Sequence, residues 1–130
     1  MKKEIILLFL LFVALSSIHA QTAQKKITNT DKSASSILAE VKSGKAYLVD
    51  VRTPEEYQSG HLKNTQNIDY NSPGFISAIG KLNKTKPVYL YCRSGNRSGK
   101  ALDTLKAQGF KSYYNLGGLE QLKKEGFAVE

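Results

Sequence analysis

The residues with the clearest chemical potential surround Cys92, the only cysteine of the 130-residue chain. The thiol follows the apolar run PVYLY (87–91), and a helical pattern begins at Ser98. A loop that joins a strand to a helix can turn its backbone N–H groups toward one point, and the N-terminus of the helix adds positive potential there. We expect these surroundings to lower the pKa of the thiol, so that part of it is a nucleophilic thiolate at neutral pH.

The loop after Cys92 combines small, polar and basic residues. Gly95 permits a tight backbone curve, and Arg97 adds a permanent, fork-shaped charge. We expect the loop to hold an anionic substrate at the sulfur through the amides and charges of Arg93, Ser94, Gly95, Asn96, Arg97 and Ser98. Arg93 could equally be a solvated surface residue. Cys92 could instead be a buried structural cysteine, but the polar stretch after it argues against burial.

The elements that must position this loop alternate between strand and helix patterns. Short apolar or alternating runs predict strands at 46–51, 65–69, 87–91 and 111–116. Helical spacing, capping residues and terminal glycines predict helices at 33–42, 53–60, 72–83, 98–108 and 117–127. This alternation indicates an α/β domain with a central, mainly parallel sheet flanked by helices. Ligands of such sheets bind beyond the carboxyl ends of the strands, where Asp50, Arg52 and Cys92 stand.

The first twenty residues have the plan of a secretory signal peptide. Lys2 and Lys3 precede an apolar run of eleven residues, 5–15, and Ala20 ends the segment SSIHA. We therefore expect cleavage after residue 20, an exported domain at 21–130 with its core at about 27–127, and a periplasmic or secreted location without stable membrane insertion. The alternative is an uncleaved N-terminal anchor, although the run is shorter than the ~20 residues of a membrane span.

Several classes of function are disfavoured by composition. The expected mature chain has 17 basic and 10 acidic residues, a net charge of +7 that favours small anionic ligands. The basic residues are scattered without interleaved aromatics, so we do not expect nucleic-acid binding. Segment 21–130 has one histidine, His61, and one cysteine. Because a zinc site needs three or four ligands, mostly Cys and His, we expect no metal and no cofactor.

Two separated motifs resemble those of the single-domain rhodaneses, a family of sulfurtransferases. The stretch CRSGNRS (92–98) resembles the family's active-site loop, and DVRTPEEYQSGHL (50–62) resembles an upstream motif. Asn67-Ile68 and LGGL (116–119) add weaker matches, so the likeness spans about residues 27–127. The resemblance implies a three-layer fold. Asn64-Thr65 and Leu122 depart from the family's usual Gly-Ala and Trp, and both departures resemble changes in packing or in a loop.

The resemblance also implies roles for individual residues. Cys92 would take a sulfane sulfur from thiosulfate or a similar small anion and pass it, as a persulfide, to a thiol or cyanide. Asp50, Arg52 and Glu56 would organise the loops through hydrogen bonds and ion pairs. His61, the only candidate histidine partner for the thiol, is better explained as a hydrogen bonder that fixes a loop.

Two other functions remain open on the sequence. One is a cysteine phosphatase or arsenate-handling enzyme of the same fold. The dual-specificity phosphatases of this fold place five residues between Cys and Arg, whereas four separate Cys92 from Arg97. A shorter loop makes a tighter ring of N–H groups, which suits a sulfane sulfur better than a tetrahedral phosphate. The other hypothesis is a sulfur carrier or interaction module without efficient turnover. The oligomeric state cannot be predicted from these residues.

Overall fold

The structure, a computed structural model, describes residues 30–130. The predicted signal peptide, residues 1–20, and the first residues of the predicted domain lie outside the described residues. Within the described part of the chain, helices and strands alternate as the sequence predicts. The helices are α2 (Ala34–Lys42), α3 (Pro54–Gln58), α4 (Phe75–Gly80), α5 (Asn96–Ala107) and α6 (Leu119–Lys124). The strands are β1 (Tyr47–Asp50), β2 (Gln66–Asn67), β3 (Val88–Cys92) and β4 (Tyr113–Gly118).

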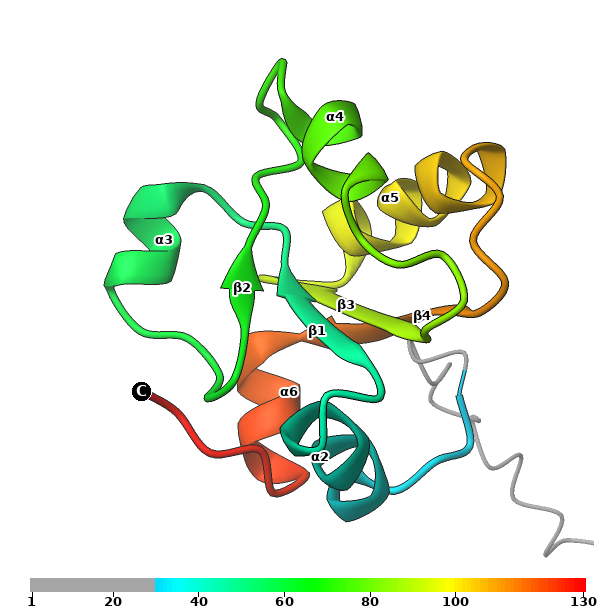
Figure 1. Ribbon diagram of the computed structural model, residues 1–130. Helices are drawn as coiled ribbons and strands as arrows, with labels where there is room; N and C mark the ends of the chain where they lie inside the picture. The colour runs from blue at the N-terminus through cyan, green and yellow to red at the C-terminus, as the bar shows by residue number, and fades with distance from the viewer. Residues whose placement is uncertain (1–29) are drawn as a thin grey trace, which may run out of the picture.

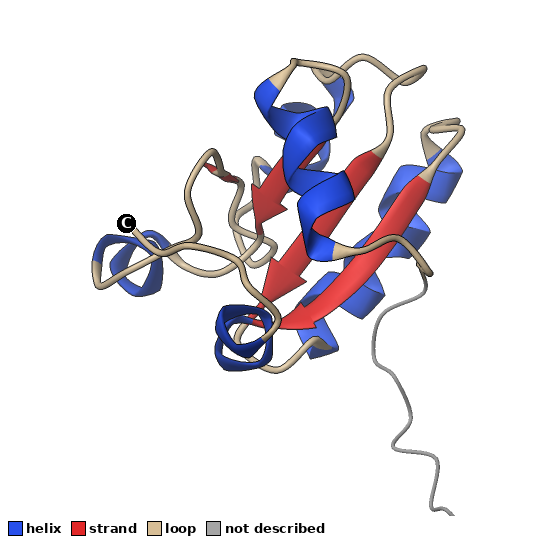
Figure 2. Cartoon of the chain, turned by 90° about the horizontal axis from the view of Figure 1, so that it is seen from below, coloured by secondary structure: helices blue, strands red, loops and turns tan. Residues whose placement is uncertain are grey.

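The four strands form one parallel sheet in the order β2-β1-β3-β4. β3 occupies a central position, and all five of its residues are buried, as expected for a strand covered on both faces. Figure 2 shows the long strand arrows pointing the same way, with helices on both sides of the sheet. The predicted mainly parallel sheet is confirmed.

Two helical layers cover the sheet. α2 and α6 lie below it and α4 and α5 above it, while α3 stands beyond the β2 edge (Figure 1). Each layer closes its own apolar core, one with Ile37, Leu48, Tyr91 and Leu122 and the other with Val49, Ile79, Leu90 and Leu105. Successive residues of a strand face opposite sides of a sheet, so Leu90 and Tyr91 belong to different cores. The three-layer architecture is confirmed.

Local signals set the elements next to the site. Thr53 caps α3 in a capping box with Glu56, and Pro54 occupies the first helical position, as predicted. α5 begins at Asn96, two residues earlier than predicted, directly after Gly95, which has a φ of 90°. β4 extends to Gly118, two residues beyond the predicted strand, because 117 and 118 continue the pairing with β3.

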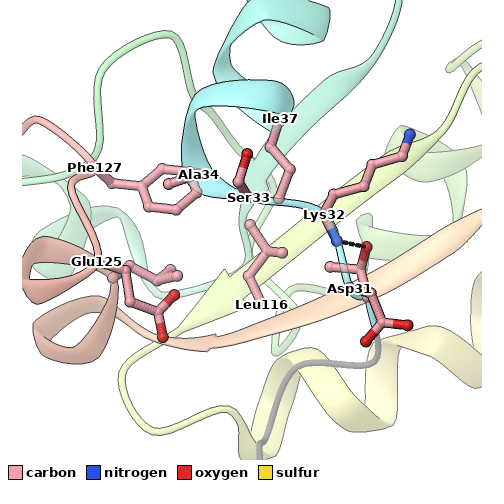
Figure 3. Close-up of a pocket in the computed structure, with 10 residues that line it drawn as sticks. Asp31, Lys32, Ser33, Ala34, Ile37, Leu116, Glu125 and Phe127 are labelled. Carbon is pink, nitrogen blue, oxygen red and sulfur yellow. Dashed lines mark hydrogen bonds between the residues drawn. The ribbon is translucent and has the colours of Figure 1, made fainter.

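A pocket of about 310 Å³ lies at the start of α2, against β4 and α6 (Figure 3). Ile37, Leu116, Leu122 and Phe127 contribute its apolar lining, and no residue of the Cys92 loop lines it. The Lys32 N–H donates to Thr30 Oγ1 at 3.2 Å beside it. Among residues 30–130, no helix is both long and apolar enough to span a bilayer.

Candidate active site

Cys92 is the last residue of β3, at the carboxyl edge of the sheet. Its neighbours Arg93, Ser94 and Asn96 are exposed, but Cys92 itself is only 1% exposed. The expectation that the polar stretch would keep this cysteine from burial is therefore wrong. The loop curves over the end of the strand, so the thiol lies beneath the polar residues instead of beside them.

The buried sulfur is the centre of a set of hydrogen-bond donors. The N–H of Gly95 points at Cys92 Sγ over 3.0 Å, and Ser98 Oγ lies 3.3 Å from the same sulfur. Burial by itself raises the pKa of the Cys92 thiol, but the Ser98 hydroxyl and the N–H groups of Ser98, Ser94 and Gly95 more than offset it, so the pKa is lowered. Donors around a sulfur stabilise its anion, so the thiolate of Cys92 is easier to form here than that of a cysteine without such donors.

Asn115 joins the loop to β4 and was not predicted as a site residue. Its Oδ1 lies 2.7 Å from Ser98 Oγ, and its Nδ2 donates to the Gly95 carbonyl at 3.0 Å. The side chain is buried, with 7% of the residue exposed. The sequence did contain a signal, since Asn115 is an amide inside the strand predicted at 111–116, and a polar side chain that a sheet buries needs hydrogen-bond partners.

The glycine pair after Leu116 lets the loop lie directly against β4. A Cβ added to Gly118 would lie 2.5 Å from the Arg93 carbonyl oxygen and 3.2 Å from the Ser94 Cα. Gly117 has a φ of 104°, a conformation that favours glycine. The LGGL segment is thus a point of close backbone approach that shapes the loop.

Arg97 lies at the start of α5 and is paired with α3. Its guanidinium forms two hydrogen bonds with the Glu56 carboxylate, at 2.7 and 3.0 Å. The bond to Arg97 lowers the pKa of Glu56 to about 2. The Arg97 pKa is raised, mainly by Glu56 and to a smaller extent by Cys92. Much of the Arg97 charge is therefore compensated by Glu56 in this structure, a pairing that the sequence did not reveal.

Asp50 and Arg52 form a second ion pair, at the end of β1. Both are buried, and Arg52 Nη2 lies 2.7 Å from Asp50 Oδ2 and donates to the Gly60 carbonyl at 2.7 Å. Asn67 Nδ2 donates to the Asp50 and Arg52 carbonyl oxygens at 3.0 and 2.8 Å. These bonds connect β1, the segment after α3, and β2 at the edge of the sheet where Cys92 lies.

His61 is stacked on Tyr57, with ring centroids 3.7 Å apart, and its Nδ1 lies 2.8 Å from the Tyr57 carbonyl oxygen. Its Nε2 lies 3.8 Å from Glu130 Oε2. In the described chain its polar contacts are with Tyr57 and Glu130, and Cys92 is not among them. The structure thus gives His61 contacts with α3 and with the C-terminal segment.

Arg93 borders an open hollow of about 530 Å³ beside the loop. The hollow is lined by Arg52, Glu56, Ser59, Gly60, Arg93, Leu119, Glu120 and Lys123. It is larger than the pocket beside α2, and three cationic and two acidic side chains line it. The hollow therefore lies beside the Cys92 loop, and Arg93 is the loop residue that lines it.

Comparison with known proteins identifies the family. A model of the rhodanese-like domain matches residues 33–125. YqhL of Bacillus subtilis, an uncharacterized protein, is 33% identical over 112 residues, covering 85% of this chain and 80% of that protein. The thiosulfate sulfurtransferase PspE of Escherichia coli is 34% identical over 74 residues, covering 57% of this chain and 71% of that protein.

A solved structure agrees with these matches. A rhodanese with anions from E. coli is similar to this chain with a TM-score of 0.54 and 30% sequence identity, covering 65% of this chain and 96% of that one. The range matched by the family model includes both motifs, 50–62 and 92–98. The chain belongs to the rhodanese-like domain family.

Proposed function

We propose that the protein is a thiosulfate-type sulfurtransferase that works through a persulfide on Cys92. The Cys92 thiolate attacks the outer, sulfane sulfur of thiosulfate. A sulfur–sulfur bond forms to Cys92 as the one within the donor breaks, and sulfite leaves with that electron pair. The negative charge then resides on the outer sulfur of the persulfide.

The second half-reaction returns the enzyme to its starting state. The thiolate of an acceptor attacks the outer sulfur, the bond to Cys92 breaks, and Cys92 leaves as a thiolate. Cyanide acts in the same way and gives thiocyanate. Neither step needs an oxidant, a reductant or a general base, because the donors around the sulfur stabilise the anion that attacks and later leaves.

One observation carries this proposal: the convergence of donors on Cys92 Sγ. The Gly95 N–H at 3.0 Å and the Ser98 hydroxyl at 3.3 Å both donate to the sulfur, which is the acceptor at the centre of the loop. The names of relatives such as PspE support the same reaction. The four-residue spacing between Cys92 and Arg97 supports sulfur over phosphate as the group transferred.

Steady-state kinetics test the proposal. Double displacement predicts ping-pong kinetics with thiosulfate and a thiol or cyanide, and no activity in Cys92→Ser. Hydrolysis of an aryl phosphate that is lost in Cys92→Ser would instead identify a phosphatase. A persulfide that forms once, with negligible transfer to several acceptors, would identify a sulfur carrier.

We propose further that the protein is exported and acts in the periplasm or outside the cell. The basic start, the apolar run 5–15 and Ala20 support this location. Protein recovered from the exported fraction should then begin at Gln21. Recovery of the full-length chain with the membrane fraction would support the uncleaved anchor.

A further inference from the structure

The Ser98 hydroxyl lies between two acceptors and has a single proton to donate. Its Oγ is 3.3 Å from Cys92 Sγ and 2.7 Å from Asn115 Oδ1. Ser98 is fully buried, and Asn115 is 7% exposed. The three side chains therefore form a short chain, sulfur to hydroxyl to amide, beneath the active-site loop.

Main-chain contacts fix which end of the Asn115 amide faces Ser98. The Gly117 N–H donates to Asn115 Oδ1 at 3.0 Å, and Asn115 Nδ2 donates to the Gly95 carbonyl at 3.0 Å. Since an N–H cannot accept and a carbonyl cannot donate, the amide has this orientation and Oδ1 is the acceptor beside Ser98. A hydrogen bond between these two oxygens, 2.7 Å apart, takes its proton from the Ser98 hydroxyl, because Asn115 Oδ1 has none.

The charge on the sulfur decides where that proton points. When Cys92 is a thiol, its S–H can donate to Ser98 Oγ while the Ser98 proton bonds Asn115. When Cys92 is a thiolate, the Ser98 hydroxyl must turn from Asn115 to the sulfur, which becomes the stronger acceptor. Asn115 thus competes with the sulfur for one proton.

We propose that Asn115 is a positioning residue that acts on the Cys92 sulfur through Ser98. The Ser98 proton bonds Asn115 Oδ1 when Sγ carries no charge and bonds Sγ when Cys92 is a thiolate. This change of hydrogen-bond acceptor should also accompany the reaction, a step that rests on the proposed sulfurtransferase function. When the negative charge moves to the outer sulfur of the persulfide, the Ser98 proton returns to Asn115 Oδ1. The same amide donates to the Gly95 carbonyl oxygen, so Asn115 also holds the active-site loop in position against β4.

The test measures how far Ser98→Ala raises the pKa of Cys92 in three backgrounds. The backgrounds are the native chain, Asn115→Asp and Asn115→Leu. The carboxylate of Asn115→Asp holds the Ser98 proton more strongly, so Ser98 stabilises the thiolate less. Asn115→Leu removes the competing acceptor, so Ser98 stabilises it more. The thiolate is followed by its ultraviolet absorbance against pH, with Cys92→Ala as the blank, since the chain has one cysteine.

We expect the rise on Ser98→Ala to be largest with Asn115→Leu, intermediate in the native chain and smallest with Asn115→Asp. Neighbouring values should differ by about half a pH unit or more, as coupled residues in contact do. Equal rises in all three backgrounds would overturn the proposal, because a merely structural Asn115 shifts the pKa without changing the effect of Ser98. If one Asn115 variant fails to fold, the other still gives the comparison with the native chain. A protein that takes no sulfur from any donor would refute the proposed function and leave this pKa order unaffected.

Discussion

At the residue scale, the reactivity proposed for Cys92 depends on what surrounds the sulfur and not on exposure. A buried thiol without donors has a raised pKa and is inert, whereas this thiol faces the Gly95 N–H and the Ser98 hydroxyl. The loop can place these donors only because β4 carries no side chain at the point of contact. Gly118 is that point, where a Cβ would lie 2.5 Å from the Arg93 carbonyl oxygen.

Gly118→Ala should therefore displace the loop and impair sulfur transfer. The added methyl meets the backbone of Arg93 and Ser94, which cannot move aside as a flexible side chain can. We expect a loss of about 1 to 3 kcal/mol in the free energy of unfolding. We also expect at least a tenfold fall in kcat/KM, since about 1.4 kcal/mol of lost transition-state stabilisation suffices for it.

The matched control is Gly74→Ala, whose Cβ would meet nothing closer than Ser72 Oγ at 3.6 Å. That distance is an ordinary contact, so we expect near-native activity. Equal activities of the two alanine variants would show that the close approach at Gly118 does not shape the site.

At the element scale, the ion pair between Arg97 and Glu56 ties the start of α5 to the first turn of α3. The Glu56 carboxylate also accepts from the Thr53 N–H at 3.4 Å in the capping box, so one carboxylate serves a helix cap and an ion pair. Both helices begin at the carboxyl edge of the sheet, one after β1 and the other after β3. The pair therefore holds the loop from the side opposite to Asn115 and β4.

This ion pair predicts a pH dependence of stability. The pKa of Glu56 is about 2 in the folded chain and 4.5 in its ordinary range, so the stabilisation is complete above about pH 4.5. It is lost as pH falls toward 2. Glu56→Gln should cost about 1 to 2 kcal/mol at pH 7, after allowance for solvent screening, and much less at pH 2. Denaturant unfolding across this pH range measures both values.

Glu55→Gln is the control for that experiment. The Glu55→Gln substitution removes the same charge from the same helical turn. Within residues 30–130, Glu55 has no ion pair. Its cost at pH 7 should be smaller than that of Glu56→Gln. Equal costs for the two variants would assign the effect to the helix terminus instead of the bond to Arg97.

At the whole-molecule scale, hydrogen bonds across the core hold the layers around the site together. The buried Tyr91 hydroxyl accepts from the Leu62 N–H at 3.0 Å, which links β3 to the segment after α3. That segment pairs with the C-terminal residues, where the Lys63 N–H donates to the Ala128 carbonyl at 2.9 Å. The chain has a single cysteine and so no internal disulfide, which leaves its stability to such packing and bonding.

Tyr91→Phe should destabilise the whole domain. Loss of the hydroxyl leaves the buried Leu62 N–H without this acceptor, at a cost of about 1 to 3 kcal/mol in urea unfolding. Tyr113→Phe removes a hydroxyl for which residues 30–130 provide no hydrogen bond, and it should be nearly neutral. A native-like stability of Tyr91→Phe would contradict this account of the core.

The sequence predicts what local patterns determine. Periodicity, the Thr53–Pro54 start of α3 and the strand–loop–helix around Cys92 lie within short segments, and the structure agrees with them. The bond of Arg97 to Glu56 joins residues 41 positions apart, and the contact of Asn115 with Ser98 joins residues 17 apart. Such pairs depend on how the layers pack, which periodicity does not report. The burial of Cys92 was missed for the same reason, since β4 lies against the loop.

The most direct test of the central claim is the intact mass of the purified protein before and after thiosulfate. A persulfide on Cys92 predicts a gain of about 32 Da, one sulfur atom, that is absent in Cys92→Ser and is removed by an acceptor thiol. No gain on the folded native protein with any sulfane donor, or an equal gain in Cys92→Ser, would contradict the claim that Cys92 carries the sulfur.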